Sequence, residues 1–492
     1  MDIIKTDTQI LLQNIGVIDP EEISSYIEYD GYGALKKAVQ MKPEDVVALM
    51  LESELRGRGG SGFPVGMKWK ITREHEGEIK YIVCNANDLD PGDYKAKVLV
   101  EGNPHNIVEA VILSGYAVGC RIGYINIPME NTLAVSRLKK AIEQAKEHGF
   151  LGENILGSGF DFDIYIRVAT GVFASGEETA LIANLEGKRG EPHHKPPYPS
   201  AEGVNGMPTV ANNIETIANI PYVILHGADW LKSIGCTDNY GTKVFTLSGK
   251  IKKTGLVEVP LGTSIREIIY DLCGVAESTV LKGVHIGGAK GSILPLDMLD
   301  IPTTYENFKK YELVIGSGGI AVLDDEDCGV ELAKNYISFA VQESCGKCTA
   351  CRIGLKRIEE MLDAISAGKA TESDISKLRE LAEIVCDSSL CGLGRNAPHP
   401  VLSTIDHFID DYKNHIKNGA CPAVAIKKSK YYKINPDKCI GCTACSRVCP
   451  MKCITGTVKN PHTIDIEKCV KCGACFKKCN FGAVEIKRME VV

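Results

Sequence analysis

The residues most able to do chemistry are the cysteines, because fifteen of the twenty lie after residue 340. Cys345, Cys348 and Cys351 are spaced at three-residue intervals, so a single turn and helix start can point them at one place. A fourth thiolate, from Ser389-Leu-Cys391-Gly-Leu-Gly, would close a four-cysteine cage for an iron–sulfur cluster. Cys386 lies near enough to be confused with this fourth ligand, and zinc is the alternative metal because four thiolates suit both.

The C-terminal tail carries the most specific spacing. Cys439-x2-Cys442-x2-Cys445-x3-Cys449-Pro repeats thirty residues later as Cys469-x2-Cys472-x2-Cys475-x3-Cys479. This is the pattern of bacterial two-cluster ferredoxins, in which the fourth cysteine of each run ligates the other cluster. We therefore expect cluster one on Cys439, Cys442, Cys445 and Cys479, and cluster two on Cys469, Cys472, Cys475 and Cys449. Asn480 replaces the usual second proline without touching a ligand, and Cys453 is expected to be a spare thiol.

Length and composition limit the class of protein. The chain has 492 residues, 44% hydrophobic and 24% charged, which suits about three or four folded domains. The first residues have neither the basic nor the apolar region of a signal peptide, and no apolar run could span a bilayer, so we expect a cytoplasmic protein. Reduced thiols in that compartment favour ligands over disulfides. A net charge of −7 argues against nucleic acid as a partner.

The segments before the cysteines alternate between helix and strand patterns. A helix beginning at Pro43 runs into the glycine loop Arg56–Pro64, whose Gly57, Gly59 and Gly62 match G-x-G-x-x-G. The dinucleotide fingerprint requires a strand before the loop, and here a helix precedes it, so an ordinary Rossmann site is disfavoured. The loop's backbone N–H groups still suit a phosphate or a flat ring, with Arg58 and Lys68 supplying charge; a plain turn is the alternative.

Polar residues also follow the predicted strands. The predicted buried strand Tyr81–Asn85 is followed by Asn87, Asp88 and Asp90. The end of such a strand is where α/β folds place ligands. A helix at about 104–119, a strand at 124–127, a helix at about 131–148 and a strand at 162–168 lead to a second glycine loop, Gly171–Thr179. Its Glu177 and Glu178 begin an apolar helix; for these acids, as for Asp88 and Asp90, helix capping is the alternative role.

Six motifs occur in a fixed order: Arg56-Gly-Arg-Gly-Gly-Ser-Gly-Phe-Pro, Gly176-Glu-Glu-Thr, Glu186-Gly-Lys-Arg-Gly-Glu-Pro, Asn212-Asn-Ile-Glu-Thr, Glu343-Ser-Cys-Gly-Lys-Cys and Ser389-Leu-Cys-Gly-Leu-Gly. Over residues 45 to 425 they resemble the NADH-oxidising flavoprotein subunit of respiratory complex I. With its ferredoxin-like tail, the layout is most similar to the beta subunit of electron-bifurcating hydrogenases and related bifurcating transhydrogenases.

The resemblance implies the cofactors and their contacts. FMN would lie in a fold similar to, but distinct from, the Rossmann fold, touched by Gly57, Arg58, Gly59, Lys68, Asn85, Asn87, Asp88, Gly176, Glu177, Asn212, Asn213 and Thr216. NAD(H) or NADP(H), as substrate, would stack near Phe63 and Tyr198, with Glu178 and Lys195 around its polar parts. The helical region would hold a 4Fe-4S cluster on Cys345, Cys348, Cys351 and Cys391, which makes three 4Fe-4S clusters with the tail.

The expected fold class is therefore multidomain α/β. It comprises a helical lead-in (1–45), a Rossmann-like domain for FMN and NAD(P) (46–240), a β-grasp, ubiquitin-like insert (241–325), a helical bundle with a 4Fe-4S cluster (326–425) and a two-cluster ferredoxin domain (426–492). Within the insert, His285 is a formal candidate ligand, for which a packing role is the stronger expectation.

Departures from the family pattern gather at the nucleotide site. The family's Asn-Ala-Asp-Glu-x-Glu-Pro-Gly is replaced by Asn85-Ala-Asn87-Asp88-Leu-Asp90-Pro-Gly, so one carboxylate is lost and two are shortened. Phe173 and Ser175 stand for a tyrosine and a cysteine, and Ile71 for an aromatic residue. These changes leave open the choice between NADH and NADPH, a weakened nucleotide site, and a flavin supplied with electrons only by a partner.

A flavin beside iron–sulfur clusters converts a two-electron donor into one-electron carriers. We expect the flavin subunit of a multi-subunit complex that moves electrons among NAD(P)H, ferredoxin and another acceptor, with flavin-based bifurcation as one route. A 2Fe-2S subunit and a terminal oxidoreductase subunit are the expected partners. Lys468, Lys471, Lys477 and Lys478 could attract an acidic ferredoxin or form a solvated face. The alternatives are a non-bifurcating diaphorase of a formate dehydrogenase or hydrogenase, and an electron-transfer subunit whose nucleotide site no longer works.

Overall fold

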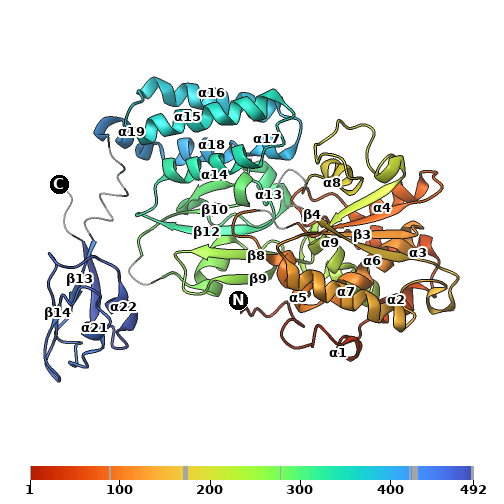
Figure 1. Cartoon of the computed structure of the whole chain (residues 1–492), viewed down its shortest axis with the longest axis horizontal. Coiled ribbons are helices and arrows are strands. Elements are labelled where there is room, and N and C mark those ends of the chain that lie inside the picture. Colours follow the sequence, from red (N-terminus) through yellow and green to blue (C-terminus); the bar gives the residue numbers. More distant parts are fainter. Residues whose placement is uncertain are drawn as a thin grey trace.

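A computed structural model describes residues 2–87, 90–169, 176–276, 279–419, 421, 423 and 430–488 (Figure 1). Along the chain it shows a parallel sheet wrapped in helices, a mixed sheet, a group of helices, and a small module with two two-stranded sheets (Figure 1). Among these residues, no helix is both long enough and apolar enough to cross a membrane. A multidomain α/β fold is confirmed, and the division into five ranges stays a prediction.

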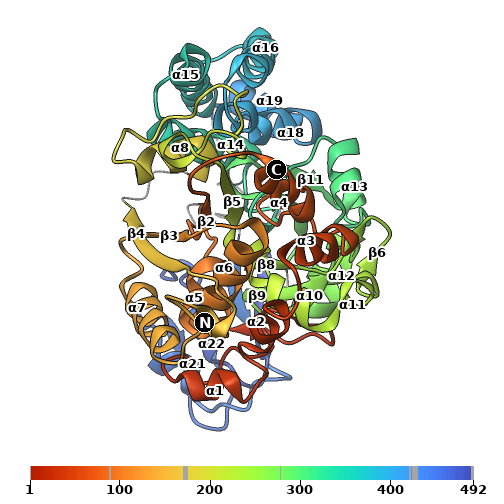
Figure 2. The ribbon, with the colours of Figure 1, turned by 90° about the vertical axis from the view of Figure 1, so that its right-hand side faces the viewer.

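The parallel sheet has the strand order β4-β3-β2-β5, visible from left to right in Figure 2. Its strands are β2 (Tyr81–Asn85), β3 (Ile122–Pro128), β4 (Asp163–Ala169) and β5 (Thr209–Asn213). The strands β3 and β4 are added on one side of β2 and β5 on the other, so the order reverses between β2 and β5. Open α/β sheets bind ligands at such a reversal, beyond the carboxyl ends of the strands.

Both faces of the central strand β2 are buried, as expected for parallel strands, whereas the edge strand β4 leaves Tyr165 and Val168 about half exposed. Ile82 and Cys84 belong to the larger core, whereas Tyr81 and Val83 pack in a smaller core against Leu181 of α8 (Glu178–Leu185). Every residue of α6 is buried. The helices of this region are α3 (Pro43–Glu52), α4 (Val65–Glu74), α5 (Lys95–Gly102), α6 (Pro104–Val118), α7 (Thr132–Glu147), α9 (Ile214–Ala218), α10 (Ile220–His226) and α11 (Ala228–Lys232).

The first glycine loop lies between α3 and α4, so the expected order of helix then loop is confirmed. The two helices pack closely because α4 has a glycine at the contact: a Cβ on Gly66 would lie 2.4 Å from the backbone nitrogen of Leu51. Any larger side chain there would separate α3 from α4. The loop is therefore held at both ends by packed helices.

The N-terminal segment differs from the helical lead-in that the sequence predicts. It contains α1 (Ile23–Ile27) and α2 (Gly33–Ala38), but also β1 (Ile3–Ile4), which pairs in parallel with β9 (Gly255–Pro260). The buried Glu258 carboxylate accepts hydrogen bonds from the backbone N–H groups of Leu11 and Leu12. A two-residue strand has no period of its own, so its pairing with a strand some 250 residues away had no signal in the sequence.

The mixed sheet has the order β1-β9-β8-β12-β10-β11. Its remaining elements are β8 (Thr242–Gly249), α12 (Ile265–Glu267) continuing as a π-helix to Cys273, β10 (Leu281–Ile286), β11 (Ser292–Pro295), α13 (Tyr305–Lys310) and β12 (Gly319–Asp324). The short hairpin β6 (Gly235–Cys236) and β7 (Asn239–Tyr240) precedes it. His285 is buried in β10 and stacks on Tyr336 with ring centroids 4.2 Å apart, the packing role expected of it.

The helical region begins directly after β12. It comprises α14 (Gly329–Glu343), α15 (Leu355–Ser366), α16 (Glu372–Ser388), α17 (Gly392–Asn396), α18 (His399–His407) and α19 (Ile409–Asn418). Leu355, Ile358, Leu362 and Ile365 recur at helical spacing and are buried, so α15 presents one apolar face to its neighbours. The helices share a core that also contains Cys351.

The tail module lies to one side of the rest of the chain (Figure 1). It is built from the antiparallel pairs β13 (Lys430–Ile434) with β16 (Val484–Arg488) and β14 (Ile454–Thr455) with β15 (Thr463–Ile464), and from the helices α21 (Ala444–Arg447) and α22 (Ala474–Lys478). Its small core is rich in cysteine. An ion pair of 3.1 Å joins Lys430 to Glu326, just beyond the end of β12.

Candidate functional site

A cavity of about 1000 Å³ opens at the carboxyl ends of β2 and β5, where the strand order reverses. Fourteen of the sixteen residues predicted to bind FMN or the nucleotide line it: Gly57, Gly59, Phe63, Lys68, Asn85, Asn87, Gly176, Glu177, Glu178, Lys195, Tyr198, Asn212, Asn213 and Thr216. Ligand sites in proteins usually span roughly 300–1000 Å³, so the cavity is large for one small molecule. Its size suits a flavin with a nucleotide beside it.

The other two predicted residues are Asp88 and Arg58. Asp88 lies outside the described residues, as do Phe173 and Ser175 of the second glycine loop. Arg58 is fully buried, and its guanidinium donates to the backbone carbonyls of Arg56 and Tyr240. Its backbone N–H donates to the Thr216 hydroxyl at 2.7 Å. Arg58 therefore supports the loop and Thr216, and its contact with FMN stays a prediction.

The cavity offers groups that fit a polar flat ligand. Both side-chain amide atoms of Asn87 are buried and have no hydrogen-bond partner among the described residues. A buried amide without a partner costs free energy, which a bound ligand would recover. A Cβ on Gly59 would lie 3.1 Å from that of Asn213, so glycine allows the loop to approach β5 closely. These features fit FMN binding at this edge.

Charges gather around Glu178 at the start of α8. Its carboxylate lies 2.6 Å from the Lys195 ammonium and 3.2 Å from that of Lys68, while Glu177 lies 2.9 Å from Lys195. Burial alone would raise the pKa of Glu178, but Lys68 and Lys195 outweigh it and lower that pKa. Burial likewise disfavours the charged form of Lys195 and would lower its pKa, but Glu178 and Glu177 outweigh burial and raise that pKa. Glu178 and Lys195 are therefore both charged at neutral pH.

Helix capping and cavity lining coexist at Glu177. Its side chain accepts hydrogen bonds from the backbone N–H groups of Thr179 and Ala180, as a cap of α8 does. The same residue lines the cavity and pairs with Lys195. The capping role is therefore present, and the contact of Glu177 with FMN stays a prediction.

Sequence motifs missed several lining residues, including Ser61, His75, Lys290 and Ser317. Lys290 and Ser317 come from the mixed-sheet region, close to Asp90, whose carboxylate accepts hydrogen bonds from the Ala289 backbone and the Ser317 hydroxyl. No sequence signal joins them to the glycine loops, because they meet the cavity only through the packing of two domains. Ile71, the site of a lost aromatic residue, also lines it.

The cysteines of the helical region lie close to one another. Cys345, Cys348 and Cys391 all contact the core that contains Cys351. Burial first, and then the neighbouring Cys348, Cys391 and Cys345 thiols, raise the pKa of Cys351 to about 11. The pKa of Cys386 is also raised to about 11, but by burial, Asp387 and Glu383 rather than by other cysteines. Cys391 packs against the core that contains Cys351 and contributes to the raised pKa of that thiol, so Cys391 is favoured over Cys386 as the fourth ligand of a cage.

The cysteine cage adjoins the cavity. Cys391, Gly392 and Leu393 line the same cavity as Asn85 and Glu177. The Arg189 guanidinium donates to the Cys345 carbonyl at 2.9 Å. A ligand in the cavity would therefore lie beside the cage, the arrangement that electron transfer requires.

Two further cavities in the tail match the predicted ligand sets. One is lined by Cys439, Cys442, Cys445 and Cys479, and the other by Cys449, Cys469, Cys472 and Cys475. The fourth cysteine of each run thus crosses to the other group, as the spacing predicts. Cys453 lines the second cavity as well, with its sulfur 3.4 Å from that of Cys449.

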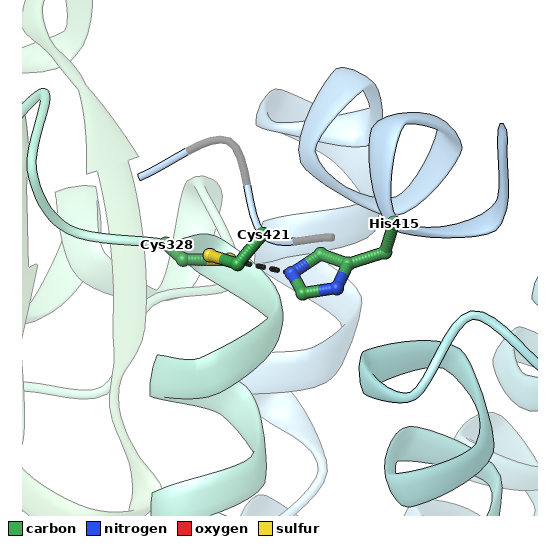
Figure 3. Close-up of side chains that lie close together, drawn as sticks. All are labelled: Cys328, His415 and Cys421. Carbon is green, nitrogen blue, oxygen red and sulfur yellow. Dashed lines mark hydrogen bonds between the residues drawn. The ribbon is translucent and has the colours of Figure 1, made fainter. Parts of the chain in front are cut away.

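A third kind of metal-binding group was not predicted. The ligand atoms of Cys328, His415 and Cys421 lie within 4.8 Å of one another (Figure 3). The Cys328 sulfur lies 3.3 Å from Nε2 of His415, while Nδ1 is 3.1 Å from the Ser366 carbonyl, the kind of contact that fixes a metal-binding imidazole. Two cysteines and a histidine suit zinc, and they are the three candidate ligands among the residues that the structure describes. Cys328 and His415 lie 87 positions apart, so no motif marks the group.

Comparisons with known proteins agree with this arrangement. Family models match residues 50–222 (Nuo51 FMN-binding domain), 244–293 (SLBB domain), 331–415 (NADH-ubiquinone oxidoreductase-F iron-sulfur binding region) and 438–483 (4Fe-4S dicluster domain). The match to a 4Fe-4S dicluster model confirms a ferredoxin-like domain in the tail.

The chain is 49% identical to HndC, a subunit of the NADP-reducing hydrogenase of Solidesulfovibrio fructosivorans, over 98% of each chain. It is 38% identical to the F 2 subunit of NADH-quinone oxidoreductase from Rhizobium meliloti (strain 1021), over 84% of this chain and 99% of that one. A crystal structure of an NAD+-reducing NiFe-hydrogenase in the H2-reduced state matches with a TM-score of 0.72 and 28% identity, over 86% of this chain and 68% of that one.

Proposed function

The chain belongs to the family that contains the F subunits of NADH-quinone oxidoreductases and their hydrogenase counterparts, and on that premise we propose that it passes electrons from NAD(P)H to iron–sulfur clusters. Members of this family are FMN- and iron–sulfur-containing oxidoreductase subunits. The single observation that carries the proposal is the shared cavity, which is lined both by the predicted flavin and nucleotide residues and by Cys391.

FMN is proposed to lie against the two glycine loops and the ends of β2 and β5. Asn85, Asn87, Asn212 and Asn213 offer side-chain amides there, and the backbone of Gly57 and Gly59 permits close approach. Bound FMN would accept a hydride as two electrons and release them singly. The protein's part is to hold the ring beside Cys391 and keep bulk water from it.

The nicotinamide nucleotide is proposed to enter between Phe63 and Tyr198, which are 46% and 56% exposed and both line the cavity. Their exposed rings offer stacking faces at its mouth. Lys195 would pair with a phosphate and Glu178 would accept hydrogen bonds from a ribose, in place of the ion pair that they form with each other. The choice between NADH and NADPH is proposed to rest on residues around Asn87 and Asp90.

Three 4Fe-4S clusters are proposed. One is held by Cys345, Cys348, Cys351 and Cys391, and the tail holds two in the sets predicted from the spacing. The order of the chain then suggests a one-electron path from the cavity through the helical cage to the tail. Residues 46–240, 241–325, 326–425 and 426–492 would fold as the corresponding domains, the first Rossmann-like and the second β-grasp-like.

The chain is further proposed to act in the cytoplasm within a complex that includes a 2Fe-2S subunit and a terminal oxidoreductase subunit, and to exchange electrons with ferredoxin. A hydrogenase-like complex is favoured, because the HndC match extends over the tail whereas the Rhizobium relative covers 84% of this chain. Flavin-based bifurcation is one way in which such a complex would exchange electrons with ferredoxin. A non-bifurcating diaphorase would share every residue named here, and rates independent of a second acceptor would identify it.

The deciding experiment is an anaerobic titration of the chain, reconstituted with iron, sulfide and FMN, first with NADH and then with NADPH. Prompt bleaching of flavin and cluster absorbance by either nucleotide is expected, and the more effective one identifies the coenzyme. If neither nucleotide bleaches the protein while dithionite still reduces the clusters, electrons enter from a partner and the proposed activity is wrong for this chain.

A further inference from the structure

The two halves of the tail are related by their repeat, so residues at equal distances from the cysteines can be compared. Ile440 in the first half corresponds to Val470, and Met451 corresponds to Phe481 in the second. All four are about half exposed, from 49% to 57%. Ile440 and Phe481 line the cluster-one cavity, and Met451 and Val470 line the cluster-two cavity. Each cluster thus has an exposed apolar pair at its edge.

The halves differ in the charge carried at two equivalent left-handed backbone positions. Gly441 (φ 69°) and Gly482 (φ 59°) occupy them beside cluster one, whereas Lys471 (φ 57°) and Lys452 (φ 52°) occupy them beside cluster two. Glycine adopts this conformation without cost and lysine does not. A third equivalent pair, Thr443 and Gly473, is also left-handed but uncharged.

Both lysines adjoin the apolar pair of cluster two. Lys452 is exposed and follows Met451. Lys471 follows Val470, and its backbone N–H lies 3.4 Å from the Cys469 sulfur. The lysines therefore place two positive charges next to the apolar edge of cluster two.

We propose that the cluster-two edge, formed by Met451, Lys452, Val470 and Lys471, docks an acidic protein that carries single electrons. This rests on the proposed function, in which the tail holds two 4Fe-4S clusters. A 4Fe-4S cluster held by Cys449, Cys469, Cys472 and Cys475 would give one electron to the oxidised carrier in each encounter, so the cluster would be oxidised and the carrier reduced, with no proton or bond exchanged. The apolar pair excludes water at the contact, and the lysines attract carboxylates on the carrier.

Charge at this edge mainly changes the rate at which the two proteins associate. A positive patch around a redox centre steers an acidic partner and raises its association rate, an effect that salt screens. The cluster-one edge has an equivalent apolar pair, and Lys459 lies near it, with its backbone N–H donating to the Gly441 carbonyl. Lys459 is also left-handed (φ 66°), so it provides a matched comparison.

The test uses the full, cluster-loaded chain carrying Lys452→Gly, Lys471→Gly, both changes, or the control Lys459→Gly. Glycine relieves the left-handed strain at each position, so all variants are expected to fold at least as well as the parent. The chain is reduced with stoichiometric dithionite and desalted, and stopped-flow absorbance then follows its oxidation by a purified acidic two-cluster ferredoxin. Cytochrome c, a basic protein, serves as the charge-reversed acceptor.

The double variant is expected to lower the second-order rate with the acidic ferredoxin about tenfold at low salt and to flatten its salt dependence. Lys459→Gly should leave that rate near the parental value, and cytochrome c should react no more slowly with the double variant than with the parent. Equal losses in Lys459→Gly and the double variant, or no loss in any variant, would overturn the proposal.

Because dithionite supplies the electrons, the docking result does not depend on nucleotide oxidation. Failure of the proposed function would instead appear as absent bleaching by NADH and NADPH in the same preparation. Electron paramagnetic resonance of the reduced chain checks beforehand that every variant holds both tail clusters.

Discussion

The Lys347 ammonium donates a hydrogen bond of 2.7 Å to the backbone carbonyl of Pro192. Lys347 lies in the turn between Cys345 and Cys348, and Pro192 lies in the loop that continues to Lys195 and Tyr198. A direct hydrogen bond therefore joins the turn between Cys345 and Cys348 to the loop that contains Pro192. A movement of the loop would also shift the backbone of the cage.

Replacing this ammonium is expected to change the cluster as well as the loop. In Lys347→Met, a cation beside the cage is lost, so the more negative reduced cluster is less favoured and its reduction potential falls. A fall of tens of millivolts is expected, since about 59 mV corresponds to about 1.4 kcal/mol for one electron. A redox titration followed by electron paramagnetic resonance measures it. Lys356→Met, which removes an exposed lysine of α15 paired with Glu359, should leave the potential unchanged.

Loss of Lys195 should weaken the nucleotide more than the flavin. Lys195→Met removes the partner of Glu177 and Glu178 and the cation proposed for a nucleotide phosphate. The dissociation constant of the nucleotide is expected to rise about tenfold, which is about 1.4 kcal/mol, with FMN content retained. Flavin bleaching during nucleotide titration gives the constant, and released FMN fluorescence gives the content. The neighbouring exposed Lys188 supplies the control Lys188→Met; a similar loss there would show that overall loop charge matters instead.

Two nearby cysteines should behave differently. Cys391→Ser is expected to abolish or alter the signal of the helical-region cluster and to lower the iron content of the chain, because it removes a proposed ligand. Cys386→Ser should retain both the cluster signal and the iron content. Burial, Asp387 and Glu383 raise the pKa of the Cys386 thiol, and no other cysteine is among the causes. Iron analysis with electron paramagnetic resonance separates the two. The opposite pattern would identify Cys386, not Cys391, as the fourth ligand.

The group of Cys328, His415 and Cys421 predicts a metal ion beyond the cluster iron. Elemental analysis of the purified chain is expected to find about one zinc per chain, and Cys328→Ser or His415→Gln should remove it. Burial raises the pKa of the Cys328 thiol to about 12, so the thiolate requires a bound cation. Cys273→Ser, at a buried thiol of the mixed-sheet region, is the matched control. Zinc content that is unchanged in Cys328→Ser would exclude this site.

Acid should destabilise the protein through buried histidines. Burial lowers the pKa of His285 to about 4 from 6.5, so between these values the unfolded chain binds more protons than the folded one. Stability is then lost as the pH falls through that window, by about 2 kcal/mol between about pH 7 and pH 5. His285→Gln cannot titrate, so its melting temperature should fall less over this interval than the parental one. His105, with a pKa of about 4, should retain its own contribution in that variant.

Sequence patterns were most informative where ligands lie close together in the chain. The three-residue spacing of the cysteines needs only one turn to become a cage, and the tail repeat predicted the two groups that line separate cavities. The strand Tyr81–Asn85 was located to the residue because its apolar run ends in asparagine. Local pattern determines these features, so the sequence alone sufficed.

Features that form when distant segments pack together could not be predicted from the sequence. Lys290 and Ser317 reach the cavity from another domain, and Cys328 meets His415 across 87 residues. The resemblance implied that Arg58 contacts FMN, and no sequence signal indicated that its guanidinium donates to the backbone carbonyls of Arg56 and Tyr240. Such arrangements depend on which surfaces meet, and no periodicity encodes that.

The pairing of β1 with β9 has a consequence for biosynthesis. Ile3 and Ile4 emerge from the ribosome early, yet Leu256 and Val257, their partners, follow some 250 residues later. At roughly 5–20 residues per second, the strand waits between about 10 and 50 seconds for its place in the sheet. A longer apolar strand left unpaired for that time would invite aggregation, and a strand of two residues offers little edge to another chain.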